Sequence, residues 1–190
     1  MVALGVDRKT TVIAGLGEAI GREFHGRTGK EISGVLVLEI HGVQADRTLV
    51  ARAIAESFRY TAPTHMVPRR TSAAVQVSGG WLPAEAEVMC FLGAANRDPR
   101  RYADPDRFDI DRAEADPERA FTPKADHLAF GGGRHFCIGA MLSKFEIRIA
   151  IERLLDAVTD LRFAGDAVPP DVGLFLRGPA SLPVRFTLRR

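Results

Sequence analysis

The sequence predicts an α+β protein, mainly α-helical with small β-sheets. Apolar residues recur at helical spacing in two stretches, residues 46–62 and 138–155. Short alternating or apolar runs, separated by glycine and proline, predict several brief strands. Before residue 46, closely spaced glycines interrupt short apolar pieces such as residues 34–40, and no clear element is predicted. The chain is therefore divided into an N-terminal segment, 1–45, and a domain, 46–190.

Both predicted helices follow from the spacing of apolar side chains. Leu49, Ile54 and Phe58, with alanines between them, suit a first helix, which should end near the Ala62-Pro63 step because proline disfavours helical geometry in the residue preceding it. In residues 138–155 the apolar positions occupy more than one stripe. This pattern is typical of a helix that is buried on most of its circumference.

The predicted strands are short and fall into two groups. In the first group an alternating run and a more buried apolar run flank a Gly-Gly turn, and in the second three short runs approach the C-terminus. The runs are residues 74–78, 87–92, 161–163, 173–176 and 184–188. Between the groups, residues 96–122 contain repeated Asp-Pro steps and many charges, which favour an ordered irregular meander over a long helix.

Composition excludes several classes of protein. With 26 Lys and Arg against 24 Asp and Glu, the net charge of +2 gives no reason to expect nucleic acid or an acidic membrane as a partner. Two cysteines, Cys90 and Cys137, do not make a disulfide scaffold and fit a reducing cytoplasm. No apolar run approaches the roughly 20 residues of a membrane span, and the start lacks the pattern of a signal peptide. We expect a soluble cytoplasmic protein.

One loop carries the main chemical signal. Residues 130–140 read Phe-Gly-Gly-Gly-Arg-His-Phe-Cys-Ile-Gly-Ala. The glycines allow the backbone to pass close to a flat ligand. Cys137 lies where the second helix is predicted to begin, and the unpaired N–H groups and positive dipole end there favour the thiolate. A thiolate binds haem iron and promotes cleavage of the O–O bond. We interpret the segment as a haem-binding loop with Cys137 as the iron ligand.

The loop resembles the cysteine-loop signature of the cytochrome P450 family. Three other segments match motifs of that family in the right order: residues 56–59 match its Glu-x-x-Arg helix, residues 95–99 its bacterial Ala-Asn-Arg-Asp-Pro string, and residues 105–108 its meander motif. The resemblance covers the domain from residue 46 onward and implies the C-terminal part of the cytochrome P450 fold. The N-terminal segment, 1–45, has no clear family match.

The resemblance also implies roles for individual residues. Glu56, Arg59 and Arg107 should form a buried triad that holds the meander, and Glu56 and Arg59 do share a helix face. Arg69 and His135 should contact the haem propionates. The loop residues expected against the cofactor are Phe130, Gly131, Gly133, Cys137 and Gly139, and those expected to line the substrate space are Thr64, His65, Met66, Val67, Phe175 and Leu176.

The function implied is that of a haem-thiolate monooxygenase, which inserts one oxygen atom from O₂ into an apolar organic substrate. The cofactor is haem b (iron protoporphyrin IX), and electrons come from a redox partner such as a ferredoxin with its reductase. The family's distal motif, which pairs an acid with an alcohol for proton delivery, has no intact match. In the nearest string, residues 14–19, Glu18 is followed by Ala19, which has no hydroxyl. No catalytic residue is assigned, and the chain is interpreted as a truncated or rearranged family member.

Other interpretations remain open. Cys137 can be a buried structural cysteine. Zinc bound by His135 and Cys137 would need four ligands at recurrent spacing, and a phosphate cradle would need a Gly-Lys-Ser/Thr ending. For the whole chain, the alternatives are a non-catalytic haem-binding remnant or interaction module, and a structural domain that binds no haem.

Overall fold

The computed structural model describes residues 46–77, 79–114, 116–164 and 170–189, together with the backbone of four short strands nearer the N-terminus. These four strands are β1 (Leu4–Asp7), β2 (Thr10–Ile13), β3 (Phe24–His25) and β4 (Glu31–Ile32). The apolar piece 34–40 and the string 14–19 lie outside the described residues. Helices and small sheets make up the architecture, as the sequence predicts.

The first predicted helix is confirmed. A short 3-10 turn, η1 (Arg47–Leu49), leads directly into α2 (Val50–Tyr60). The Asp46 carboxylate accepts hydrogen bonds from the backbone N–H and the hydroxyl of Thr48, which satisfies a donor at the start of the turn. Most residues of α2 from Ile54 onward are buried, including two charged ones. This helix is therefore the central element of the described chain.

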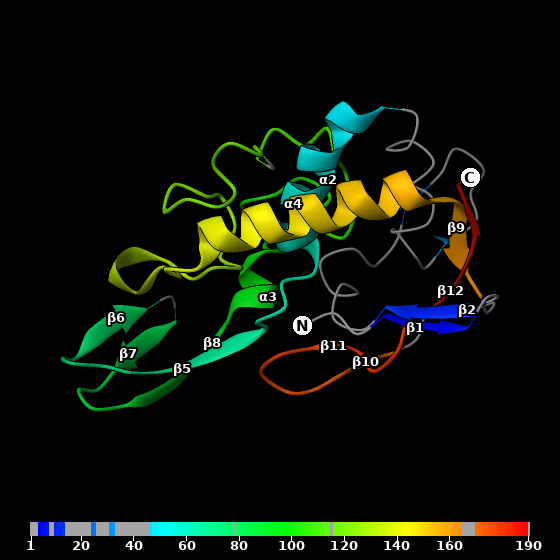
Figure 1. Cartoon of the computed structure of the whole chain (residues 1–190). Coiled ribbons are helices and arrows are strands. Elements are labelled where there is room, and N and C mark those ends of the chain that lie inside the picture. Colours follow the sequence, from blue (N-terminus) through cyan, green and yellow to red (C-terminus); the bar gives the residue numbers. More distant parts are fainter. Residues whose placement is uncertain are drawn as a thin grey trace.

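The second predicted helix is α4 (Ala140–Ala157), but the expectation that most of its circumference is buried is wrong. Only Ala140 and Leu155 are buried within α4. In the described chain the helix contacts α2 and β9 along one side, and Figure 1 shows it running past α2. Several apolar side chains on and just before the helix are exposed: Ile138, Met141, Leu142, Phe145 and Ile149. The helix thus carries more apolar side chains than the described part of this chain covers.

Two small antiparallel ladders lie near the N-terminal end of α4. One pairs β5 (Met66–Arg70) with β8 (Glu87–Phe91), and the other pairs β6 (Val75–Val77) with β7 (Gly80–Leu82). The strand predicted at residues 87–92 is present, but it alternates between exposed and half-buried residues and is not a buried strand. A short helix, α3 (Leu92–Ala95), follows it.

A four-stranded sheet lies at the other end of α4. Its order is β1-β2-β12-β9, in which β9 (Val158–Phe163) and β12 (Pro183–Leu188) pair antiparallel and β12 also pairs with β2. Two of the three runs predicted near the C-terminus, 161–163 and 184–188, lie in β9 and β12 and are confirmed. The remaining predicted run, 173–176, is not a strand, because Gly173 (φ +100°) turns the chain between β10 (Asp171–Val172) and β11 (Gly178–Pro179).

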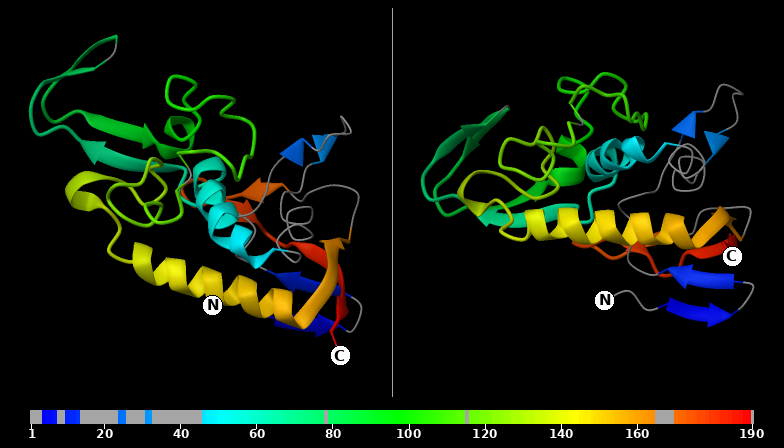
Figure 2. Two further views of the ribbon diagram at one scale, coloured as in Figure 1. Left: turned by 90° about the horizontal axis from the view of Figure 1, so that it is seen from above. Right: turned by 45° about the horizontal axis from the view of Figure 1, so that its top comes forward.

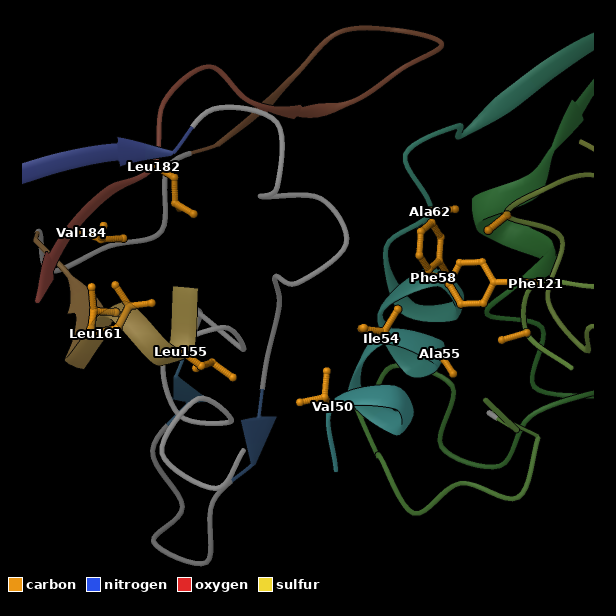
Figure 3. Packing of buried hydrophobic residues seen from close by; sticks show 13 residues of the cluster. Val50, Ile54, Ala55, Phe58, Ala62, Phe121, Leu155, Leu161, Leu182 and Val184 are labelled. Carbon is orange, nitrogen blue, oxygen red and sulfur yellow. The ribbon is translucent and has the colours of Figure 1, made fainter. Parts of the chain in front are cut away.

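The hydrophobic core joins α2 to the four-stranded sheet and the end of α4. Figure 3 shows α2 side chains on one side and residues of α4, β9 and β12 on the other. The buried cluster comprises Val50, Ile54, Ala55, Phe58, Ala62, Ala120, Phe121, Ala129, Leu155, Val158, Leu161, Leu182 and Val184. Among the described helices none is long and apolar enough to cross a membrane.

The predicted meander is confirmed. Within the described part of residues 96–132 the chain forms turns and bends without a helix or strand, and a single 3-10 turn, η2 (Gly133–His135), precedes Cys137. The cysteine loop and the β5–β8 ladder lie at the same end of the molecule in Figures 1 and 2. This end collects most of the residues to which the sequence assigned a functional role.

Candidate functional site

The cysteine loop is closed by its own backbone. The N–H of Cys137 donates to the carbonyl of Phe130 (2.9 Å), and the N–H of Phe136 donates to the carbonyl of Gly133 (3.1 Å). Gly131 (φ +73°) and Gly133 (φ +61°) adopt the left-handed conformation that other residues resist. The loop therefore requires glycine at both positions, and its ends are brought together across a short reverse turn.

Cys137 is exposed and lies just before the start of α4. The cysteine is exposed and is not in a disulfide, and its carbonyl accepts a hydrogen bond from the N–H of Ala140 (3.3 Å), the first residue of the helix. A Cβ atom added at Gly139 would lie 3.7 Å from the Cys137 sulfur. Glycine at this position therefore leaves the sulfur uncovered, and the positive end of the helix dipole lies beside it.

Phe130 fixes the start of the loop to the protein core. Its ring centroid lies 4.8 Å from that of Phe58 on α2, 5.3 Å from that of Phe121 and 6.3 Å from that of Phe136. Each aromatic pair of this kind contributes about 1 kcal/mol beyond the area it buries. Phe130 thus anchors the start of the loop to the core, and its predicted contact with the cofactor stays a prediction.

A buried ion pair underlies the meander. Glu56 and Arg59 are 0% and 1% exposed, and Arg59 donates from Nε (2.8 Å) and Nη2 (2.7 Å) to the two carboxylate oxygens of Glu56. The remaining donors of Arg59 bind three carbonyl groups, of Asn96 (3.0 Å), Pro105 (2.8 Å) and Arg107 (3.0 Å). All five N–H groups of this guanidinium are therefore used, and the meander is held at its start and near its middle.

The third member of the cluster is Arg112, and the assignment of Arg107 is corrected. The Arg107 side chain is exposed, and the residue contributes its backbone carbonyl. The Nε of Arg112 lies 3.3 Å from Oε1 of Glu56, and this side chain is only 6% exposed. Arg112 also donates to the carbonyls of Ala103 and Asp104. The family motif ends before Arg112, so no spacing rule in the sequence pointed to it.

Substitution of the two arginines should separate their roles. Arg112→Ala removes charge-assisted hydrogen bonds to a buried carboxylate and should lower the free energy of unfolding by about 2 kcal/mol. Arg107→Ala leaves the carbonyl in place and should change it by less than about 0.5 kcal/mol. Urea denaturation of both variants measures the difference, and equal losses would restore Arg107 to the cluster.

The two segments assigned to the substrate space lie side by side. Thr64 forms an isolated antiparallel bridge with Leu176, and the N–H of His65 donates to the carbonyl of Phe175 (3.0 Å). Leu176 and Phe175 are exposed, whereas Thr64 and His65 are half-buried. The segments around residues 64–65 and 175–176, more than a hundred positions apart in the chain, therefore pair through their backbones and form one edge.

A cavity of about 550 Å³ opens beside this edge. His65 and Met66 line it, but so do charged side chains, and the full lining is Tyr60, Thr61, Ala62, His65, Met66, Phe91, Gly93, Ala94, Arg97, Asp171 and Arg177. Because side chains alternate along a strand, Met66 lies on the face of β5 opposite to Val67 and Arg69. The cavity and Arg69 thus lie on different sides of β5.

Arg69 and His135 are both exposed. Nη1 of Arg69 donates to the carbonyl of Pro68 (2.7 Å), which orients the guanidinium at the end of β5. His135 ends η2, just before Cys137. Both side chains offer hydrogen-bond donors at the end of the molecule that carries the cysteine loop, where an anionic group could be bound.

His127 is a buried histidine that the sequence analysis did not single out. It is 3% exposed, stacks 6.2 Å from the ring of Phe58 and accepts a hydrogen bond from the N–H of Ala129 on Nδ1 (3.3 Å). Burial lowers the pKa of His127 to about 4, with Arg59 acting in the same direction and Asp126 against it. Protonation of Nδ1 would remove the acceptor that Ala129 needs.

This histidine predicts acid sensitivity of the fold. Between its ordinary pKa near 6.5 and its folded-state pKa of about 4, the unfolded chain binds a proton that the folded chain does not. The free energy of unfolding should therefore fall by roughly 3 kcal/mol as the pH decreases through this window. Urea denaturation between pH 7 and 4 measures the slope, and His127→Phe, which keeps a ring but does not titrate, should flatten it. Identical slopes in the two proteins would refute the assignment.

Comparison with known proteins identifies the family. The model of the family described as "Cytochrome P450" matches residues 40–161. Pulcherriminic acid synthase of Bacillus subtilis is 43% identical over 148 residues, which cover 78% of this chain and 36% of that protein. Steroid C26-monooxygenase of Mycolicibacterium smegmatis is 40% identical over 144 residues, or 75% of this chain and 33% of that protein.

Solved structures agree with the sequence comparison. Cytochrome P450 CYP109Q5 from Chondromyces apiculatus matches with a TM-score of 0.69 and 36% identity, and the match covers 80% of this chain and 37% of that one. P450BioI, solved in complex with an acyl carrier protein, matches with a TM-score of 0.67 and 32% identity over 79% of this chain. The chain spans about a third of the length of its curated relatives. The cysteine loop, the buried ion cluster and the fold therefore belong together: this chain is a member of the cytochrome P450 family.

Proposed function

We propose that this chain provides the cysteine-bearing part of a haem-thiolate monooxygenase site, in which Cys137 would bind the iron. The observation that carries the proposal is the exposed Cys137 thiol on a closed glycine loop, beside the N-terminal end of α4. A cysteine sulfur that is exposed and not in a disulfide is free to bind a metal ion, and iron is bound by the thiolate form. The family of the chain supports the same assignment.

The residues present fit a haem. A haem is a flat apolar ring with two carboxylates, and here the open sulfur has apolar neighbours in sequence, of which Ile138 is fully exposed and Met141 is 45% exposed. Arg69 and His135 supply donors suited to carboxylates. We propose haem b as the cofactor, since its apolar ring suits the exposed apolar side chains and its two propionates suit the donors of Arg69 and His135.

When bound, the haem supplies the activation of O₂ and the transfer of one oxygen atom to an organic substrate. Cys137 ligates the iron and donates electron density to it. Gly131 and Gly133 would let the loop backbone lie close to the cofactor. Gly139 leaves the Cys137 sulfur uncovered. In this proposal Arg69 and His135 orient the cofactor, and the edge formed by Thr64–Val67 with Phe175 and Leu176 contacts the substrate.

Substrate and partners follow from less direct support. The exposed Phe175 and Leu176 favour an apolar organic substrate, and one relative is named for its action on steroids. We propose a ferredoxin with its reductase as the electron donor, because membership of the cytochrome P450 family favours a separate redox partner. The two free cysteines favour a reducing cytoplasm.

A non-catalytic role is the second candidate, and the exposed apolar face of α4 favours it. Leu142, Phe145 and Ile149 are more than half exposed, which marks an unpartnered surface. No acid and alcohol pair for proton delivery was found in the sequence, and the chain spans about a third of its relatives. In this second candidate function, the chain is a haem-binding remnant or an interaction module that does not turn over substrate.

The CO-difference spectrum of the haem-loaded chain tests the ligand. Wild type and Cys90→Ala should both give the band typical of a thiolate ligand after reduction under CO, because Cys90 is the other free cysteine. Cys137→Ala should lose that band altogether. If Cys137→Ala gave the same spectrum as wild type, the assignment of Cys137 as the iron ligand would be wrong. Haem binding without oxygenated product, with peroxide supplied as the oxidant, would favour the non-catalytic role.

A further inference from the structure

Asn96 occupies a fully buried position between α2 and the cysteine loop. It follows α3 and is 0% exposed. Its Oδ1 accepts a hydrogen bond from the N–H of Leu128 (2.7 Å), and its Nδ2 lies 3.5 Å from the carbonyl of Phe58. Because the N–H of Leu128 can only donate, the amide must present oxygen to it and nitrogen to Phe58. The side chain therefore bridges a helix and a loop in one orientation.

The backbone of Asn96 is fixed independently of its side chain. Its carbonyl accepts a hydrogen bond from Nη1 of Arg59 (3.0 Å), and its N–H donates to the carbonyl of Leu92 (2.9 Å). Arg59 is itself held by both oxygens of Glu56. Asn96 is thus a rigid part of the core, so its amide defines a fixed point for whatever it binds.

Leu128 leads directly into the cysteine loop. Its N–H is held by Asn96 and its carbonyl accepts a hydrogen bond from the N–H of Gly131 (2.9 Å). Phe130, between these two residues, accepts the N–H of Cys137 (2.9 Å). The polar path from the rigid core to the cysteine therefore passes through Asn96 and Leu128.

We infer that Asn96 is a positioning residue for Cys137. It sets the point at which the cysteine loop leaves the core, through the bond from the Leu128 N–H, and so limits where the Cys137 backbone can lie. The inference rests on the proposed function only in taking Cys137 as the iron ligand. The aromatic contacts of Phe130 resist separation of the loop from the core but are compatible with sliding of the rings, whereas a hydrogen bond of 2.7 Å fixes one atom pair.

Amide hydrogen exchange of the haem-free full chain tests this directly. Asn96→Leu removes the acceptor and should raise exchange across residues 128–137 by about tenfold, which corresponds to the loss of one hydrogen bond, while exchange in α2 stays unchanged. Asn96→Asp retains an oxygen for the Leu128 N–H, and its second oxygen, protonated because a fully buried acid resists ionisation, can donate to the Phe58 carbonyl. Exchange in this variant should stay within about threefold of wild type. Ser57→Ala is the matched control, because it removes a partly buried hydrogen bond to Ala53 inside α2 and leaves the loop unchanged.

Three results are decisive. Faster exchange in residues 128–137 of Asn96→Leu, with recovery in Asn96→Asp, supports the inference. Unchanged exchange in Asn96→Leu overturns it, and so does an equal rise in α2 and the loop, which would show a merely structural role. If the wild-type chain failed to bind haem, the proposed function would fail, but the exchange result would stand on its own.

A spectroscopic readout extends the test to the loaded protein. Asn96→Leu should lose part of the thiolate-type CO band, because a displaced loop moves the sulfur, and Asn96→Asp should retain it. Ser57→Ala should keep the full band. A full band in Asn96→Leu would contradict the inference even if the exchange rates had changed.

Discussion

The guanidinium of Arg59 is the group on which the described structure depends. It lies in the core with 1% of its side chain exposed, and burying such a charge costs several kcal/mol unless every donor is satisfied. Here the carboxylate of Glu56 takes two N–H groups and three backbone carbonyls take the others. A segment without regular structure thereby gains a fixed path, because its own carbonyls complete the burial of the ion.

Helix α2 places this cluster and the cysteine loop on a common support. Glu56 and Arg59 hold the meander, while Phe58 packs against Phe130 at the start of the loop. The loop then depends on contacts made far from the cysteine, and Cys137 itself stays exposed for a ligand. Position and reactivity are separated in this way: buried residues determine where the sulfur lies, and the open side of the loop determines what it can bind.

Features that arise locally were predictable, and features that arise from long-range packing were not. The extent of α2, the irregular meander and the glycine loop follow from spacing and from proline and glycine positions. The place of Arg112 beside Glu56 depends on how the meander folds back, which no short pattern encodes. Similarly, the apolar residues of α4 predicted burial, but burial requires neighbours, and the described part of this chain covers one side only. The roles of His127 and Asn96 appear only once α2 and the loop are seen together.

The most direct test of the account is the substitution Arg59→Lys. Lysine keeps the positive charge and much of the length, but it cannot pair with both carboxylate oxygens while also donating to three carbonyls. The account predicts that the free energy of unfolding, measured in urea, falls by at least about 3 kcal/mol, because a carboxylate and three carbonyl groups lose partners inside the core. A loss below about 0.5 kcal/mol would show that charge alone suffices and would contradict the account.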